Sequence, residues 1–250
     1  MVANPSGAEA EKLLSRKSKR VVILMPSFGT CPVRLENQEF VIAWYAERGM
    51  PTVLGADERG RRSGWFSRAR AMNYAARTAV NEYPERDVFV LADNDLIPDA
   101  GPFLAAVQTA DVHSAVIPHA ITLLTDPQGR REVFMRGETT RVEPVEQGSR
   151  SYVVMTRENY AAVNGMDEIF EGWGPEDQAF RLSITKQLDF PLELPGRRLH
   201  LWHPVDPSRR DVRQLNANRR RKRLYEIKHG AGVAAFAREY GRWDRGQQDG

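Results

Sequence analysis

The sequence predicts an α/β fold in which a mostly parallel central sheet is flanked by helices, with a helical extension at the C-terminal end. Short apolar runs rich in β-branched residues alternate with longer segments of helical periodicity in the first half of the chain. The first run, 21–25, is continuously apolar, as in a strand buried on both faces. A length of 250 residues, 41% hydrophobic and 28% charged, suits one globular α/β domain with a short appendage.

The elements of the first half follow a flexible lead over residues 1–18. Strands are expected at 21–25, 51–56, 87–92 and 112–117, and helices at 32–48, 66–83 and 102–109. Strands joined by helical crossovers run parallel, so this alternation predicts a parallel sheet. Pro26 ends the first strand and Pro84 lies just beyond the second helix, where a chain stops being helical.

The regular alternation of strands and helices ends in the second half of the chain. Residues 121–145 predict irregular structure or a hairpin, and 152–155 predicts a further strand. Thr156 can cap the helix that follows, which stops at Asn164-Gly165. Pro175 suits the first position of a helix that runs to about Gln187. The expected organisation is the lead at 1–18, a catalytic domain at 19–207 and a basic helical extension at 208–250, with a last amphipathic helix near 233–240.

Composition excludes several classes of protein. No apolar run reaches the roughly 18 residues that a membrane helix needs, and the polar first residues lack a signal-peptide core. Cys31 is the only cysteine, which rules out an internal disulfide and a four-cysteine zinc site. A cytoplasmic enzyme is therefore expected, and for a phage gene this would be the bacterial host cytoplasm.

The net charge of +3 is unevenly placed, since residues 208–229 hold nine Lys/Arg against two acids. Such a segment is either a solvated helical face or a contact for phosphate, nucleic acid or an anionic surface. The run Arg219–Arg223 is too dense for one helix face, because a helix turns once in about 3.6 residues. Some of these cations must therefore point toward the domain or a partner.

Three clusters of residues could carry chemistry. Asp93-Asn94-Asp95 follows an apolar strand, where open α/β sheets place their ligands, and its oxygens suit Mg²⁺ or Mn²⁺ on a diphosphate. Gly172-Trp173-Gly174 brings backbone and a flat aromatic face to a ligand, and Glu176-Asp177 starts the next helix. The helix dipole lowers the pKa of carboxylates there and burial raises it, so these residues are either caps or acid–base groups. His200 and His203 flank a Trp and can bind a metal.

In this order the segments resemble the GT-A glycosyltransferases, closest to the β-1,4-galactosyltransferase family and related chondroitin-type polymerases, in their anchorless bacterial or phage form. The element Phe66–Asn73 is similar to that family's nucleotide-contacting Phe-Asn-Arg-Ala-Lys-Leu-Leu-Asn, and Asp93–Asp95 to its Asp-Val-Asp motif (the DXD motif). Asn164-Gly165 with 172–177 resembles its Asn-Gly-Phe and Gly-Trp-Gly-Gly-Glu-Asp stretch. The resemblance covers roughly residues 20 to 225 and implies a Rossmann-like GT-A fold.

The resemblance also implies a role for each matching residue. Pro26 and Phe28 would border the base of a UDP-sugar, Arg34 would lie near the phosphates, and Phe66, Arg68, Asp93 and Trp173 would contact the nucleotide or donor sugar. Asp95 and His203 would bind Mn²⁺ or Mg²⁺, Glu176 would hold a sugar, and Asp177 would be the general base of a hexosyltransferase that inverts the anomeric carbon. The chain departs from the family at His200, which stands in place of a methionine metal ligand, and at Pro175 and Gln178-Ala179.

Two other functions remain open at this stage. A nucleotidyltransferase also places acids beyond a parallel sheet, but 26–29 is a poor phosphate loop. A non-enzymatic module could bind nucleic acid or an anionic surface through 209–223. The acceptor of a transferase could be a glycan, a protein or modified DNA.

Overall fold

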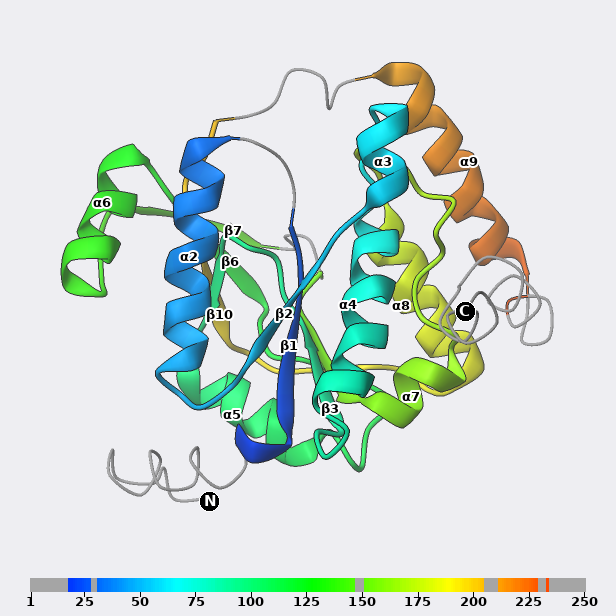
Figure 1. Ribbon diagram of the computed structural model, residues 1–250, viewed down its shortest axis with the longest axis horizontal. Helices are drawn as coiled ribbons and strands as arrows, with labels where there is room; N and C mark the ends of the chain where they lie inside the picture. The colour runs from blue at the N-terminus through cyan, green and yellow to red at the C-terminus, as the bar shows by residue number, and fades with distance from the viewer. Residues whose placement is uncertain (1–17, 28–30, 147–150, 205–210, 229–232, 234–250) are drawn as a thin grey trace.

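The computed structural model describes residues 18–27, 31–146, 151–204, 211–228 and 233, and it places helices on both faces of a central sheet (Figure 1). The strands are β1 (Val21–Pro26), β2 (Thr52–Gly55), β3 (Val88–Leu91), β4 (Leu96–Pro98), β5 (Val116–Ile117), β6 (Ile121–Thr125), β7 (Val142–Glu146), β8 (Val153–Thr156), β9 (Leu192–Glu193) and β10 (Arg197–His200). The helices are the 3-10 turn η1 (Ser18–Arg20), α2 (Pro32–Ala46), α3 (Glu58–Ser63), α4 (Arg68–Glu82), α5 (Ala100–Thr109), α6 (Pro127–Arg136), α7 (Arg157–Ala162), α8 (Glu176–Gln187) and α9 (Val212–Ile227).

The larger sheet has six strands in the order β2-β1-β3-β8-β5-β9. β1 pairs in parallel with β2 and with β3, as the sequence predicted. The sheet is mixed, however, because β8 lies between β3 and β5 and runs antiparallel to both. The chain enters β8 from the direction of β7 and not from a crossover helix, so nothing requires β8 to run parallel.

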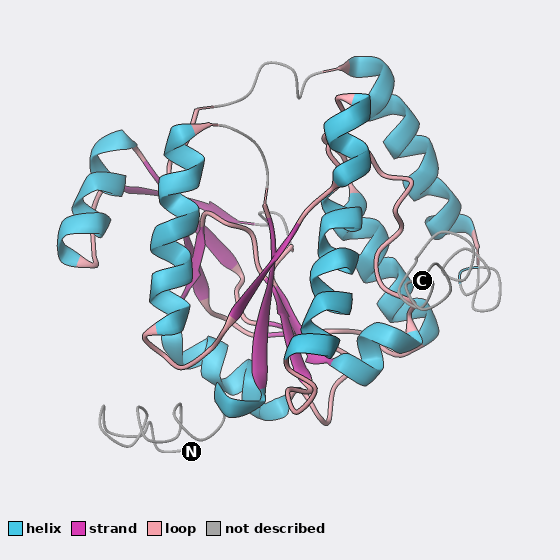
Figure 2. Ribbon diagram, in the orientation of Figure 1, coloured by secondary structure: helices cyan, strands magenta, loops and turns pink. Residues whose placement is uncertain are grey.

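A second, four-stranded sheet has the order β4-β10-β6-β7, and Figure 2 shows it as a separate group of strands beside α2. Its strands β6 and β7 correct the expectation of irregular structure over 121–145: they pair antiparallel, as a hairpin would, with α6 between them. Asp126 caps α6, since its Oδ1 accepts a 2.6 Å hydrogen bond from the backbone nitrogen of Gly129. The sequence Asp126-Pro127 is a start signal for α6, and it was not recognised as one in the sequence.

The core forms two clusters, one on each face of the larger sheet. Alternate residues of β1 point to opposite faces: Ile23 packs with α2 and α5, and Leu24 packs with α4, α7 and α8. Both side chains are fully buried, which stabilises the fold by about 1.5–3 kcal/mol for each relative to exposure. The expectation of a strand buried on both faces is confirmed.

The C-terminal part of the described chain follows the expected order with small differences. Thr156 caps α7 as predicted, through a 3.1 Å hydrogen bond from the backbone nitrogen of Asn159. Asn164 has a φ of 58°, and helix α7 has ended before it. Pro175 is the N-cap of α8 and not its first helical residue. The basic segment forms α9 against α8; of the helix predicted near 233–240 only Val233 lies within the described residues, and it is helical.

Among the described residues, no helix is long and apolar enough to cross a membrane.

Candidate active site

A cavity of about 1300 Å³ opens at the carboxyl ends of β1 and β3, the edge where α/β sheets place their ligands. It gathers the residues that the sequence singled out, from segments far apart in the chain. They are Pro26, Arg34, Phe66, Arg68, Asp93, Asp95, Trp173, Glu176, Asp177, His200 and His203. Phe28, predicted to border the nucleotide base, lies outside the described residues.

Asp95, His200 and His203 form a cluster that can hold a metal ion, since one ligand atom from each lies within 4.8 Å of the others. Asp95 stands in the turn between β3 and β4, and its carbonyl oxygen accepts a 2.8 Å hydrogen bond from the backbone nitrogen of Leu201. This bond ties the turn to the end of β10, where His200 is the last strand residue and His203 follows in the next loop. A carboxylate with two imidazoles suits a divalent ion such as Mn²⁺, so the residues present fit the metal that the sequence implied.

The electrostatics of this cluster favour metal ligation. Burial opposes the charge of Asp95, but His200, His203 and Arg34 outweigh it and hold the pKa of that carboxyl well below its usual range. The Asp95 Oδ2 atom lies 3.2 Å from His203 Nε2 and 3.5 Å from Arg34 Nη1. Burial lowers the pKa of His200, which favours the neutral ring. Metals bind ionised carboxylates and neutral imidazoles, and both forms are favoured here.

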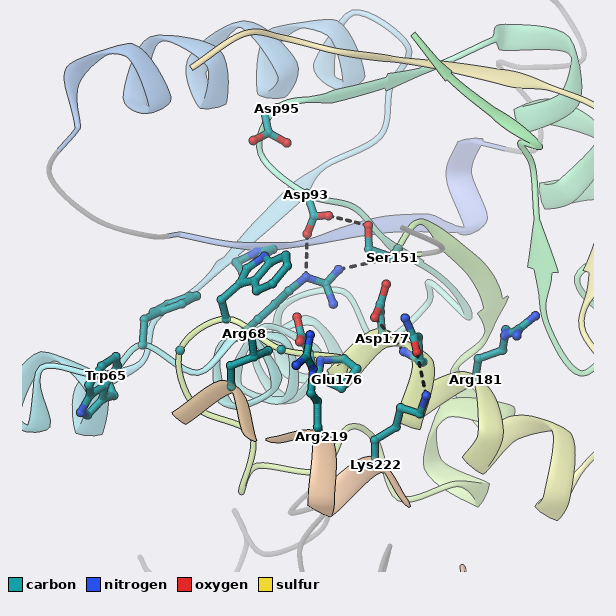
Figure 3. A pocket seen from close by; sticks show the side chains of 18 of the residues that line it. Trp65, Arg68, Asp93, Asp95, Ser151, Glu176, Asp177, Arg181, Arg219 and Lys222 are labelled. Carbon is teal, nitrogen blue, oxygen red and sulfur yellow. Dashed lines mark hydrogen bonds and ion pairs between the residues drawn. The ribbon is translucent and has the colours of Figure 1, made fainter. Parts of the chain in front are cut away.

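Asp93 is not part of the metal-binding cluster but pairs with Arg68, which is partly buried. Its Oδ1 accepts a 2.6 Å hydrogen bond from Arg68 Nε, and its Oδ2 accepts one of 2.6 Å from the hydroxyl of Ser151 (Figure 3). Arg68 Nη2 also donates to the carbonyl oxygen of Ser151 at 3.1 Å. Arg68 is thereby fixed at the cavity wall. Its contact with a nucleotide, and that of Asp93 with a sugar, stay predictions.

The polar residues in the first turns of α4 have two different roles. Ser67 caps the helix and Arg68 faces the cavity, but the next two polar residues hold a loop in place. Arg70 pairs with Asp57 and with Glu171, each at 2.8 Å. Asn73 Oδ1 accepts hydrogen bonds from the backbone nitrogen of Met166 at 2.9 Å and from the hydroxyl of Tyr160. This element thus both lines the cavity and anchors the loop that precedes α8.

The two glycines around Trp173 are required by two different contacts. Gly172 has a φ of 63°, a conformation that favours glycine. A Cβ atom on Gly174 would lie 2.5 Å from the side-chain nitrogen of Asn218 in α9, which is closer than atoms pack. The loop therefore lets α9 approach, and it leaves Trp173 60% exposed at the cavity.

The acids at the start of α8 differ in environment. Burial, with a smaller contribution from Asp177, raises the pKa of Glu176 to about 8. Of the opposing effects weighed from the sequence, burial therefore wins at Glu176. Asp177 is half-buried and lines the same cavity, with Oδ1 2.8 Å from the backbone nitrogen of Gln178. One carboxyl is thus biased toward its protonated form, and a second carboxyl stands beside it on the same cavity.

Helix α9 is part of the site, because one of its faces is fastened to the Gly-Trp-Gly loop. The Asn218 side chain donates to the carbonyl oxygens of Glu171, at 2.7 Å, and Trp173, at 3.1 Å. Arg221 Nε lies 2.7 Å from the buried carboxylate of Asp167. This contact confirms that part of the arginine run points toward the domain. Lys186 of α8 donates to carbonyl oxygens at the end of α9.

Ser151 and Arg198 are among the residues of the cavity wall that sequence reasoning missed. Arg198 lies on β10, is 3% exposed, and donates to Thr122 Oγ1 at 3.0 Å and to Ser151 Oγ at 3.3 Å. Burial lowers its pKa to about 10, against the opposing effect of Asp93, Asp95 and Asp177. The one available signal was an arginine two residues before His200, in a segment that otherwise supplies metal ligands.

Comparisons with known proteins support the architecture. A family model described as the N-terminal domain of galactosyltransferase matches residues 147–193, which contain the Gly-Trp-Gly loop and α8. No curated protein matches the chain in a sequence search.

Two solved structures of Drosophila origin are similar to this chain. A variant of β-1,4-galactosyltransferase 7 in complex with manganese, UDP-Gal and xylobiose is 16% identical, with a TM-score of 0.50 over 84% of this chain and 82% of that chain. The catalytic domain of the same transferase with xylobiose is 15% identical, with a TM-score of 0.48 and the same coverage of both chains. The similarity to the complex with manganese, UDP-Gal and xylobiose confirms the predicted α/β fold of GT-A type.

Proposed function

We propose that this chain, a glycosyltransferase of the GT-A fold, moves a sugar from a UDP-sugar to an acceptor hydroxyl and inverts the anomeric carbon. The observation that carries the proposal is the convergence of Asp95, His200 and His203 with Glu176 and Asp177 on one cavity. A ligand set for a divalent ion and a carboxylate that can accept a proton are the two parts that a displacement at an activated sugar needs.

The donor end of the cavity is proposed to lie around the metal-binding cluster. Asp95, His200 and His203 would hold Mn²⁺ or Mg²⁺, which supplies positive charge to offset that of a departing diphosphate. Arg34 pairs with Asp95 and Arg68 with Asp93, and guanidinium groups recognise phosphate through paired hydrogen bonds. Pro26 and Phe66 line the same end and supply apolar surface for the nucleotide base.

The chemical step is proposed to use Asp177 as the general base. Asp177 accepts the proton of the acceptor hydroxyl, whose oxygen forms a bond to the anomeric carbon. The bond between that carbon and the diphosphate oxygen breaks, UDP leaves, and the sugar is inverted. Glu176, whose raised pKa favours the protonated form at neutral pH, can donate a hydrogen bond to a sugar oxygen. Trp173 offers an exposed aromatic face to a sugar ring.

The released product tests this proposal against nucleotidyl transfer. The protein is incubated with a panel of UDP-sugars, Mn²⁺ and a mixture of acceptors, and the nucleotide products are separated. Release of UDP that depends on the metal and on the acceptor is the expected result. Release of pyrophosphate from a nucleoside triphosphate, with no reaction of any sugar nucleotide, would make the chain a nucleotidyltransferase. The anomeric configuration of the product, read by NMR, tests inversion. The cytoplasmic location stays a prediction.

A further inference from the structure

The wall of the cavity formed by α9 is strongly basic. Cavity-lining cations on α8 and α9 are Arg181, Arg219, Arg220, Lys222 and Arg223, and the facing acid on α9 is Glu226. Lys222 pairs with Glu226 at 2.9 Å and Arg181 with Glu193 at 3.3 Å. Within the described part of the chain, Arg219 and Arg220 make no hydrogen bond or ion pair. The wall therefore has a surplus of positive charge directed at solvent inside the cavity.

This basic wall lies away from the metal-binding cluster. In Figure 3, Glu176 and Asp177 stand between Asp93 and Asp95 on one side and Arg219 and Lys222 on the other. Lys222 Nζ also lies 3.2 Å from the side-chain oxygen of Gln178, the residue after Asp177. In an in-line displacement the attacking hydroxyl and the leaving diphosphate lie on opposite sides of the anomeric carbon, and the general base lies on the side of the hydroxyl. The basic wall lies beyond the proposed base Asp177, as seen from the metal-binding cluster (Figure 3), so it faces the acceptor. The donor phosphates are proposed to bind Arg34 and Arg68 instead.

The wall is also held in a fixed position. Asn218, Arg221 and Tyr225 attach the opposite face of α9 to the domain through Glu171, Trp173 and Asp167. With that face fixed, Arg219 and Arg223, which are one helical turn apart, must face the cavity together. A helix rises about 1.5 Å per residue, so the lining from Leu215 to Glu226 extends over roughly 16 Å. That length exceeds a single sugar ring and suits a chain with several charges.

We infer that the acceptor is an acidic oligosaccharide, whose carboxylate or phosphate groups bind the arginines of α9 while its terminal hydroxyl reaches Asp177. This inference rests on the proposed function. A glycan is favoured over nucleic acid because the cations line a cavity that admits a chain end beside Trp173, and not an extended outer groove that follows a nucleic-acid backbone. Arginine, rather than lysine, supplies most of the charge, and its planar fork matches both carboxylate and phosphate.

The test measures binding of labelled oligosaccharides by fluorescence anisotropy, with the full chain, UDP and Mn²⁺. The probes are a hexamer of a hexuronic acid, the same hexamer with its carboxyls reduced, a phosphorylated hexose hexamer, and a single-stranded oligonucleotide of equal charge. We expect one or both acidic hexamers to bind about tenfold more tightly than the neutral one at low salt, a preference that falls as salt is added. The tighter of the two identifies the charged group as carboxylate or phosphate.

Paired variants locate the effect. Arg219→Gln with Arg223→Gln should remove most of the preference for the acidic hexamer, whereas Arg131→Gln with Arg136→Gln, on exposed positions of α6 across the molecule, should keep it (Figure 1). Equal affinities for acidic and neutral hexamers would overturn the inference, as would tighter binding of the oligonucleotide than of either acidic hexamer. Calorimetry with the UDP-sugar and Mn²⁺ reports separately on the donor: no binding there contradicts the proposed function, and intact binding with no acidic preference contradicts the acceptor inference alone.

Discussion

The side-chain amide of Asn218 donates hydrogen bonds to two carbonyl oxygens of the loop before α8, those of Glu171 and Trp173. Asn218 is 2% exposed, and a Cβ atom on Gly174 would collide with it. The position of α9 and the shape of the Gly-Trp-Gly loop therefore depend on each other. A residue outside every motif of the sequence thus fixes a wall of the cavity.

Replacing Asn218 should lower stability and disturb the acceptor side. In Asn218→Ala two buried hydrogen bonds are lost, so the free energy of unfolding should fall by about 1–3 kcal/mol, measured by urea denaturation. Arg213→Ala on the exposed part of α9 is the control and should change it by less than about 0.5 kcal/mol. Equal losses in the two variants would mean that the amide contributes nothing specific.

The metal-binding cluster predicts an order of effects. Asp95→Ala should abolish transfer that depends on Mn²⁺ while the fold is kept, since Asp95 supplies the only carboxylate of the cluster. His203 Nε2 lies 3.2 Å from Asp95 Oδ2 and His200 Nε2 lies 3.8 Å from it, so His203→Ala should weaken metal affinity more than His200→Ala does. Calorimetric titration with Mn²⁺ gives the ranking, with His113→Ala as a control remote from the cavity. A greater loss in His200→Ala would reverse the assignment.

Asp177→Asn should separate chemistry from binding. The substitution keeps the shape of the side chain and removes its basicity, so kcat should fall by about 10²–10⁴ while the affinity for the UDP-sugar stays nearly unchanged. Glu176→Gln should instead act mainly on the KM of a sugar substrate. Steady-state kinetics beside donor calorimetry distinguishes these effects. Wild-type kcat in Asp177→Asn would return Asp177 to the alternative role of a helix cap.

The raised pKa of Glu176 predicts a pH dependence of stability. In the unfolded chain this carboxyl ionises near its ordinary value of 4.5, but in the folded protein it stays protonated to about pH 8. The folded state therefore binds more protons between these values, and the contribution of Glu176 to stability falls as the pH rises across this window. The Tm of the wild type should drop more than that of Glu176→Gln between pH 5 and pH 8. Parallel curves, from differential scanning calorimetry without added metal, would contradict the shift.

The sequence predicted the parts of the fold that have strong local signals. β1 was identified because its run is apolar on both faces, and α7 because Thr156 caps it. The Asp-Val-Asp-like turn and the two histidines were placed together only through their order along the chain. The structure brings ligand atoms of Asp95, His200 and His203 within 4.8 Å of one another. Local patterns thus identified Asp95, the Gly-Trp-Gly loop and the two histidines, and the family resemblance added Pro26, Arg34, Phe66 and Arg68.

What the sequence did not predict depends on partners distant in the chain. β8 enters the sheet between β3 and β5, and no local pattern specifies the neighbours of a strand. Arg198 is recognisable as part of the cavity only once Thr122 and Ser151 are beside it. Asn218 is one of two asparagines in a polar helix until the loop that it binds is known. In each case the information is in the tertiary contact and not in the residue.

One face of α9 holds the helix to the domain and the other lines the cavity, so the acceptor specificity of the protein can be changed separately from its fold. The contacts that hold the helix come from Asn218, Arg221 and Tyr225, whereas the exposed side chains of Arg219 and Arg223 make no hydrogen bond or ion pair with the rest of the described chain. Exposed positions of this kind usually tolerate substitution within about 0.5 kcal/mol. The cavity-facing positions of α9 can therefore be randomised in a library on an unchanged scaffold. Selection from such a library would search for new acceptors while the donor half stays constant.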